Sequence, residues 1–249
     1  MESKIQYIVK KTSELTLNDE KNFYRIFNEV YNQGEKIKKI FDKKYYSNIY
    51  GDSILVFAVL DEECIGIQAF LRNDLFDREA YQSGDSITVE KCRGMGVFTG
   101  MVENGIKKIP KDAIIYGFPN NNSLPVFKKM GWNIGNRKKY NLYFPKDKKK
   151  ISEIEPEYIE WLLKDFCNLR YKKCGNTYFI LKRRKLNLYQ IIGKISKNNL
   201  KGRIKRTFLP ILIFYEEKGI VGNGMVPIWY GNKFGVEIPD YKIDTILAE

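Results

Sequence analysis

The segment Val89–Met101 constrains the fold of this chain more than any other part of the sequence. It reads Val-Glu-Lys-Cys-Arg-Gly-Met-Gly-Val-Phe-Thr-Gly-Met, so an extended stretch passes through a turn with two glycines into a helical stretch. Gly94 and Gly96 permit unusual backbone angles and a close approach to a ligand. The amides that open the helix would then converge on an anion such as a pyrophosphate. An ordinary strand-to-helix turn would also account for the segment.

Two other phosphate-binding motifs are disfavoured at this turn. No Gly-Lys-Ser/Thr follows it, as a P-loop requires, and Gly-x-Gly-x-x-Gly is not matched.

The patterns around this turn predict an α/β fold. Asp61-Glu62-Glu63 is expected to close an antiparallel hairpin. Strands are predicted over residues 5–9, 54–60, 64–70, 87–89 and 113–118, and helices over 18–33, 35–45, 99–108 and 120–130. This order predicts a mixed, mostly antiparallel, twisted sheet flanked by helices.

The charged segment Lys146–Lys150 is the predicted domain boundary. It separates a first domain, residues 1–145, from a smaller α/β domain, residues 151–249. In the second domain we predict helices near 156–168 and 198–206, and strands at 177–181, 188–192, 208–215 and 235–238.

The two domains share a short sequence pattern. Phe41-x-x-Lys44-x-Tyr46-x-Asn48 recurs as Trp161-x-x-Lys164-x-Phe166-x-Asn168, each followed by an apolar strand, at 53–60 and at 177–181. The match is either chance or the trace of two related halves. The second half has no glycine turn at the corresponding place, so a duplicate would have lost cofactor binding.

The absence of histidine limits the chemistry. Ser-His-Asp and Cys-His catalytic systems and Cys/His zinc sites are excluded, and we expect no metal. A general base must be a carboxylate, Tyr, Lys, Cys or a chain of waters. The four cysteines form no Cys-x-x-Cys, and no signal peptide or bilayer-length apolar run is present, so we expect a cytoplasmic protein.

The formal net charge of +13 has two interpretations. It fits a solvated lysine-rich surface, or attraction to an anion such as CoA, a nucleotide sugar or nucleic acid. Because no nucleic-acid recognition motif is present, a nucleic-acid partner is disfavoured.

Two stretches resemble the GNAT (Gcn5-related N-acetyltransferase) family. Arg93-x-x-Gly96-x-Phe98 is similar to its pyrophosphate motif, Gln/Arg-x-x-Gly-x-Gly/Ala. Phe98 departs from the small residue of the motif, as in bacterial members linked to surface-polysaccharide clusters. Tyr116–Trp132 resembles the later family segment, in which a strand, an Asn and a helix end in aromatic-x-x-x-Gly-aromatic. The resemblance covers residues 5–145.

The resemblance implies acetyl-CoA, or another short acyl-CoA, as co-substrate. Val89 would offer backbone groups to the pantetheine arm and the thioester carbonyl, and Asn120 would meet the pantetheine or an ordered water. The pyrophosphate would be held by Arg93, Gly94, Met95, Gly96, Val97, Phe98 and Thr99.

The resemblance also suggests catalytic residues. Asp85 occupies the place of the family's base, although it also fits a plain turn residue. Phe127 replaces the usual tyrosine acid, so the acid is Tyr116 or another residue, or is unnecessary.

The implied reaction is transfer of an acyl group to a primary amine. The expected acceptor is an amino-sugar on a nucleotide carrier, which would place the protein in polysaccharide biosynthesis. The second domain, residues 151–249, would contribute to the groove that binds this acceptor. The alternatives are a tandem aminoacyl-transfer enzyme that uses charged tRNA, and a non-enzymatic basic protein that binds nucleic acid.

Overall fold

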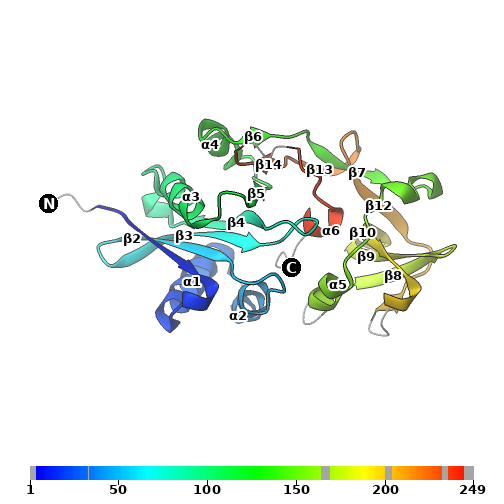
Figure 1. Ribbon diagram of the computed structural model, residues 1–249, viewed down its shortest axis with the longest axis horizontal. Helices are drawn as coiled ribbons and strands as arrows, with labels where there is room; N and C mark the ends of the chain where they lie inside the picture. The colour runs from blue at the N-terminus through cyan, green and yellow to red at the C-terminus, as the bar shows by residue number, and fades with distance from the viewer. Residues whose placement is uncertain (1–3, 33, 164–168, 200–203, 232–234, 244–249) are drawn as a thin grey trace. The chain divides into compact units, whose positions relative to one another are not determined.

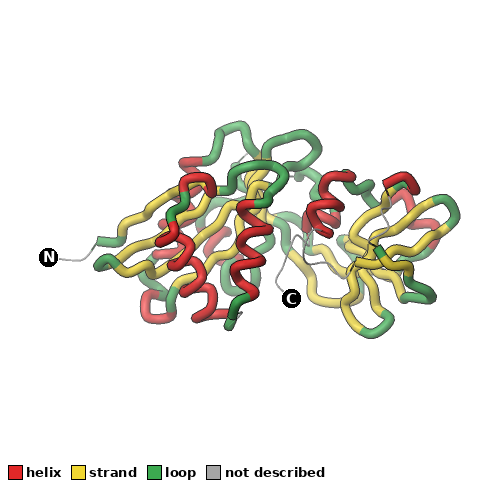
Figure 2. The backbone as a smooth tube through the Cα atoms, turned by 90° about the horizontal axis from the view of Figure 1, so that it is seen from below, coloured by secondary structure: helices red, strands yellow, loops and turns green. Residues whose placement is uncertain are grey.

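The chain forms two compact units (Figure 1, Figure 2). The computed structural model describes residues 4–32, 34–163, 169–199, 204–231 and 235–243. The first unit comprises Met1–Ile134 and Ile228–Gly235, and the second comprises Gly135–Pro227 and Val236–Glu249. Within the described residues each unit contains one seven-stranded sheet.

The sheet of the first unit has the strand order β1-β2-β3-β4-β5-β14-β6. All neighbouring strands are antiparallel except β4 and β5, which are parallel. Its elements are β1 (Gln6–Lys11), α1 (Leu17–Tyr31), α2 (Lys36–Phe41), β2 (Ile54–Leu60), β3 (Glu63–Arg72), β4 (Ala80–Thr88), α3 (Val97–Lys108), β5 (Ile114–Gly117), α4 (Leu124–Lys129), β6 (Asn133–Ile134) and β14 (Ile228–Trp229).

Helices cover both faces of this sheet: α3 lies on one face, and α1 and α2 lie on the other (Figure 1). Thr16 begins α1 with a capping box, in which its hydroxyl accepts the amide of Asp19 and the Asp19 carboxylate accepts the amide of Thr16. α2 continues into a π-helical turn, Asp42–Tyr46. Phe41 joins the two helices because its ring packs edge-on against Phe23.

The sheet of the second unit has the order β11-β8-β9-β10-β12-β7-β13. Two neighbouring pairs, β10 with β12 and β8 with β11, are parallel, and the rest are antiparallel. Its elements are β7 (Lys138–Leu142), α5 (Pro156–Leu163), β8 (Leu169–Cys174), β9 (Thr177–Lys185), β10 (Leu188–Ile195), β11 (Lys205–Arg206), β12 (Ile211–Glu216), β13 (Val221–Met225) and α6 (Asp240–Ile243).

The mixed α/β architecture predicted from the sequence is confirmed, with local corrections. The strand expected at 235–238 is absent, since those residues are irregular. The helix expected at 198–206 is wrong in its described part, which ends in β11; its residues 200–203 lie outside the described residues. No helix in the described part of the chain combines the length and apolar character that crossing a bilayer requires.

The chain divides earlier than the Lys146–Lys150 boundary that we expected. β7 already belongs to the second sheet, and β14 returns to the first. The lysine-rich segment belongs to the second unit and has partners there: the Asp147 carboxylate accepts the Phe144 amide at 2.9 Å, and Lys150 pairs with Glu216 at 2.6 Å. The charged segment Lys146–Lys150 is therefore part of the folded surface of the second unit and is not a linker.

The two sheets repeat one topology. An antiparallel meander, β2-β3-β4 or β8-β9-β10, is followed by a parallel strand, β5 or β12. The ladder has a register shift between Ile67 and Ala69 in the first meander and between Ile191 and Gly193 in the second. The strand beside β5 on its other side is β14, and the strand beside β12 is β7. β14 comes from near the end of the chain, whereas β7 belongs to the continuous segment that forms the second unit. The two sheets therefore form a tandem arrangement.

The short sequence repeat agrees with this topology in part. Phe41 ends α2 and Trp161 lies in α5, and each helix precedes a meander. The first strand of the second meander is β8, however, and not the 177–181 strand that we matched with 53–60. The matched residues Lys164, Phe166 and Asn168 lie outside the described residues.

Candidate functional site

β4 and β5 separate at the middle of the first sheet. They pair in parallel from Ala80 with Ile114 to Ser83 with Gly117, whereas β4 continues to Thr88 in its ladder with β3. The β4 edge over residues 84–88 therefore faces a gap in the β4–β5 ladder. Such a separation exposes backbone groups to a ligand, because strand amides and carbonyls otherwise have partners.

At this edge the backbone of Thr88 faces the gap, next to Val89, whose assigned role stays a prediction. The Val89 amide donates to the Ile65 carbonyl at 2.9 Å, and the Val89 carbonyl accepts the Cys92 amide at 3.0 Å. Backbone groups alternate in direction along an antiparallel strand, so those of Thr88 point away from β3. Hydrophobic pattern does not report the hydrogen-bonding register, so the sequence alone does not distinguish the backbone directions of Thr88 and Val89.

The glycine turn has the backbone geometry that its sequence predicted. Gly94 and Gly96 have φ angles of +82° and +77°, in the left-handed region that favours glycine. A Cβ atom at either position would meet nothing within 4 Å, so the turn is open on that side. Glu90, whose side chain is 89% exposed, faces solvent and lies 3.9 Å from the Arg93 guanidinium.

The same turn leaves amides available at the start of α3. The helix begins at Val97 after Gly96, two residues earlier than predicted, and its first internal bond runs from the Gly100 amide to the Gly96 carbonyl at 3.0 Å. The amides of Val97, Phe98 and Thr99 precede that bond, so they have no acceptor within the helix. The first turn contains no acidic residue. The positive end of α3 can therefore receive an anion.

The ring of Phe98 packs toward α4. It meets Phe127 at 5.4 Å between ring centroids with the planes perpendicular, and Phe127 in turn packs on Trp132 at 4.7 Å. Phe98 thus contributes to the contact between α3 and α4. Phe127 is buried and has no hydroxyl to donate.

Asn120 holds the turn that precedes α4. Its carboxamide oxygen accepts the amides of Asn122 at 3.0 Å and Ser123 at 2.9 Å, and its carbonyl accepts the Leu124 amide. The residue is exposed. The side-chain oxygen of Asn120 is thus engaged with its own turn, and the side-chain NH₂ group can donate a hydrogen bond to a ligand.

Asp85 lies in a small pocket and is not a solvated turn residue. Its Oδ2 accepts Lys44 Nζ at 2.7 Å and also the Tyr45 hydroxyl, and the Lys44 and Asp85 side chains are only 8% and 12% exposed. The backbone of Asp85 is left-handed, with φ of +47°, a strain that clusters at functional sites. The pocket is lined by Lys44, Tyr45, Ala69, Leu71, Gln82, Gly84 and Asp85.

Two hydrogen bonds orient the Asp85 carboxyl group in this pocket. Burial, and then the negative charge of Asp85, raise the pKa of Tyr45 well above its usual value, so its hydroxyl stays protonated and donates. Lys44 supplies the compensating positive charge. Both bonds use Oδ2, so Oδ1 is the oxygen through which Asp85 can accept a proton or a hydrogen bond from a ligand. Sequence reasoning missed Lys44 and Tyr45, which lie about forty positions away.

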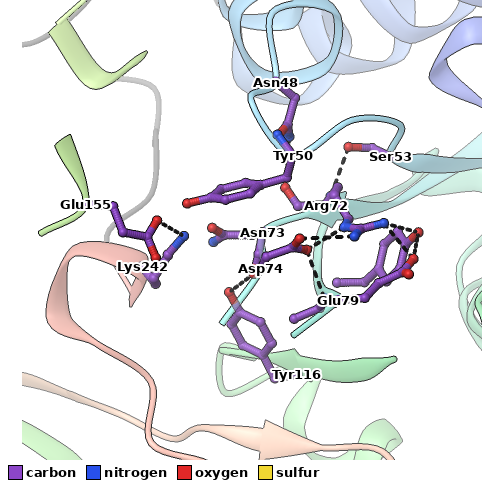
Figure 3. A network of polar contacts seen from close by, with 12 residues as sticks. Asn48, Tyr50, Ser53, Arg72, Asn73, Asp74, Glu79, Tyr116, Glu155 and Lys242 are labelled. Atoms are coloured by element: carbon purple, nitrogen blue, oxygen red, sulfur yellow. Dashed lines mark hydrogen bonds and ion pairs between the residues drawn. The ribbon is translucent and has the colours of Figure 1, made fainter. Parts of the chain in front are cut away.

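Tyr116 is a core residue. Its side chain is fully buried, and its hydroxyl donates to the Asn73 carbonyl at 3.4 Å (Figure 3). Arg72, which precedes Asn73, forms ion pairs with Asp74 and with Glu79, the latter at 2.6 Å. These contacts fix the connection between β3 and β4.

Figure 3 also shows an ion pair of the second unit. Lys242 is buried, lies 3.7 Å from the Glu155 carboxylate, and has its Nζ 4.3 Å from the ring centroid of Tyr158. Charge and aromatic contact together stabilise this buried cation.

The positive charge of the chain is concentrated in the second unit. Its sequence contains 23 of the 43 basic residues but only 12 of the 30 acidic ones, which gives +11 for this unit against +2 for the first. Any attraction of the chain for a large anion therefore acts mainly through the second unit.

No family model and no curated protein matches this sequence. Its fold does match solved structures. A putative acetyltransferase from Pyrococcus horikoshii has a TM-score of 0.52 at 13% identity, over 97% of this chain and 94% of that chain. A GCN5-related N-acetyltransferase from Kribbella flavida has a TM-score of 0.54 at 10% identity, over 91% and 71%. A probable N-acyltransferase from Enterococcus faecalis has 0.51 at 12%, over 91% and 71%. At these identities the likeness establishes the fold: this chain has a GNAT-like fold with two mixed sheets in tandem.

Proposed function

We propose that this chain is an acyl-CoA-dependent N-acyltransferase that moves an acetyl or other short acyl group to a primary amine. The observation that carries the proposal is the left-handed Gly94–Gly96 turn at the N-terminus of α3, beside the edge where β4 leaves β5. The GNAT-like fold is consistent with it, as is the pocket at Asp85.

The residues present fit the diphosphate of acyl-CoA. Three amides at the start of α3, an open glycine turn and no first-turn carboxylate suit an anion, and Arg93 can add a charge-assisted bond. When bound, acyl-CoA supplies an activated thioester. The backbone of Thr88 lies on the open β4 edge, where its amide would donate to the thioester carbonyl and stabilise developing negative charge.

Asp85 is the general base of this proposal. Oδ1 accepts the proton of the attacking amine, while Lys44 and Tyr45 hold the carboxylate through Oδ2. We assign no general acid, because Phe127 has no hydroxyl and the Tyr116 hydroxyl is buried against the Asn73 carbonyl. A CoA thiolate can leave unprotonated, so positioning and carbonyl polarisation supply the rate.

The acceptor that we propose is an amino-sugar on a nucleotide carrier, because the charge of the second unit suits a nucleotide diphosphate. Transfer from a charged tRNA is the second candidate, which the tandem sheets and the same charge favour. The open anion turn at α3 favours the CoA reaction over it. A purely nucleic-acid-binding role would leave the Asp85 pocket without a purpose.

Two measurements test the proposed function. Acetyl-CoA at a hundred times its Kd should add about 2.7 kcal/mol to the free energy of unfolding, which a thermal-shift assay detects. Release of free thiol from acetyl-CoA, followed with a set of nucleotide-linked amino-sugars, should then identify the acceptor. Stabilisation by charged tRNA with no effect of acetyl-CoA would contradict the proposal and favour the second candidate.

A further inference from the structure

Four large apolar side chains of the second unit are strongly exposed. Leu186 is 80% exposed, Leu209 90%, Phe208 72% and Ile211 54%. Leu186 lies in the turn between β9 and β10, Phe208 and Leu209 lie in the segment that leads into β12, and Ile211 begins β12. The Ile211 amide donates to the Asn187 carbonyl at 2.8 Å, which joins the two segments. We call these four residues the apolar tip.

The backbone holds part of the apolar tip in a strained conformation. Leu209 has a φ of +42°, which residues other than glycine rarely adopt, and its side chain is almost fully exposed. Neither packing nor a turn glycine compensates for this cost. An exposed apolar cluster on a folded protein marks a surface that contacts something else.

The apolar tip is surrounded by positive charge. Arg183 and Lys185 precede Leu186, and Lys205 and Arg206 precede Phe208; all four are exposed. The Arg206 guanidinium lies 4.9 Å from the ring centroid of Phe208. No acidic residue occurs in the sequence of either segment, 183–188 or 204–211.

We infer that the apolar tip inserts into the surface of an anionic lipid bilayer. Leucine and phenylalanine side chains gain free energy when they leave water for the acyl region, and flanking lysines and arginines gain it near anionic headgroups. The second unit, with its net charge of +11, is attracted to such a surface as a whole. A nucleic acid would pair its phosphates with the lysines and arginines, but it would leave Leu186 and Leu209 exposed to water.

This inference concerns the second unit alone and does not depend on the proposed acyl transfer. It predicts that the protein docks peripherally, with the tip shallowly inserted. Because hydrophobic insertion and electrostatic attraction contribute together, removing either should weaken binding strongly.

Sedimentation with lipid vesicles tests the inference. The full chain should sediment with phosphatidylcholine–phosphatidylglycerol vesicles and stay in solution with phosphatidylcholine alone. The double variant Leu186→Ser/Leu209→Ser should bind at least about ten-fold more weakly. The double variant Arg183→Gln/Lys185→Gln should lose about five-fold per charge, and salt should weaken the wild type in the same direction.

The matched control is Leu17→Ser. The exposed fraction of Leu17, 75%, is similar to that of Leu186, but Leu17 lies at the start of α1 in the first unit. It should sediment like the wild type, and circular dichroism should show that all variants are folded. Unchanged vesicle binding by Leu186→Ser/Leu209→Ser would overturn the inference. So would the absence of vesicle binding by the wild type, including the case in which it binds a DNA or RNA duplex instead.

Discussion

The two sheets of this protein share a strand topology but differ where the first parallel strand begins. After β4 the chain forms the glycine turn and the twelve-residue helix α3, whereas after β10 the described chain forms only a 3-10 turn, Lys197–Asn199, and β11. Among the described residues, a helix that begins directly after the third strand of the meander is thus found in the first unit only.

Corresponding glutamines show how the two sheets are used. Gln82 lines the pocket of Asp85 in the first sheet. Gln190, at the matching place beside β12, is fully buried, and its Oε1 accepts the Arg184 guanidinium at 2.5 and 2.8 Å. Tyr140 and Tyr215 stack beside it at 4.4 Å. At these matching places the first sheet lines a pocket, and the second sheet holds a buried glutamine bonded to Arg184 and flanked by two tyrosines.

Among variants that test the difference between the two sheets, Asp85→Asn is expected to have the largest effect on activity. Loss of the general base should lower kcat about 10²- to 10⁴-fold while CoA affinity stays near the wild-type value. Gln190→Met, at the second-sheet counterpart of Gln82, which lines the same pocket as Asp85, should leave kcat near wild type. Steady-state kinetics with the identified acceptor measures kcat for both variants. Equal losses of kcat would contradict a catalytic role for the first sheet alone.

Gly96→Glu is expected to have the next largest effect. It puts a carboxylate where the proposal puts a diphosphate, so CoA affinity measured by calorimetry should fall about 100-fold. Gly175→Glu is its control, because Gly175 also has a positive φ, of +61°, and open space around its Cβ, but lies between β8 and β9. Similar affinities of the two variants for CoA would contradict the site.

Gly105→Ala should reveal how closely α3 is docked on the first sheet. In an exposed helix this change adds up to about 1 kcal/mol of stability. Here a Cβ would overlap the ring of Phe70, so we expect a loss of about 1–3 kcal/mol in the free energy of unfolding by urea. Glu103→Ala, on the exposed side of the same helix, should stay within about 0.5 kcal/mol of wild type. A stabilised Gly105→Ala variant would refute the close contact.

Local features of the fold were predictable from the sequence. The β2–β3 hairpin, α1 and the glycine turn each carry their own signal, in periodicity, caps and turn residues. The return of β14 to the first sheet carries no such signal. β14 has only two residues, Ile228–Trp229, and pairs with strands about a hundred positions away, so tertiary contacts alone specify it.

Only part of the candidate site was likewise predictable from the sequence. The glycine turn follows from a local motif, and Asp85 was identified only through the resemblance to the GNAT family. The ion pair between Lys44 and Asp85 depends on where α2 packs on the sheet, and no local pattern reports that. The roles assigned to these residues stay predictions.

Amide hydrogen exchange with and without CoA tests the central claim most directly, because it reports the backbone groups that are proposed to hold the diphosphate. CoA should slow exchange over Met95–Thr99 at the start of α3, and should leave the segment 204–211 before β12 unchanged. Undiminished exchange at Met95–Thr99 under saturating CoA, or protection confined to the second unit, would contradict the account.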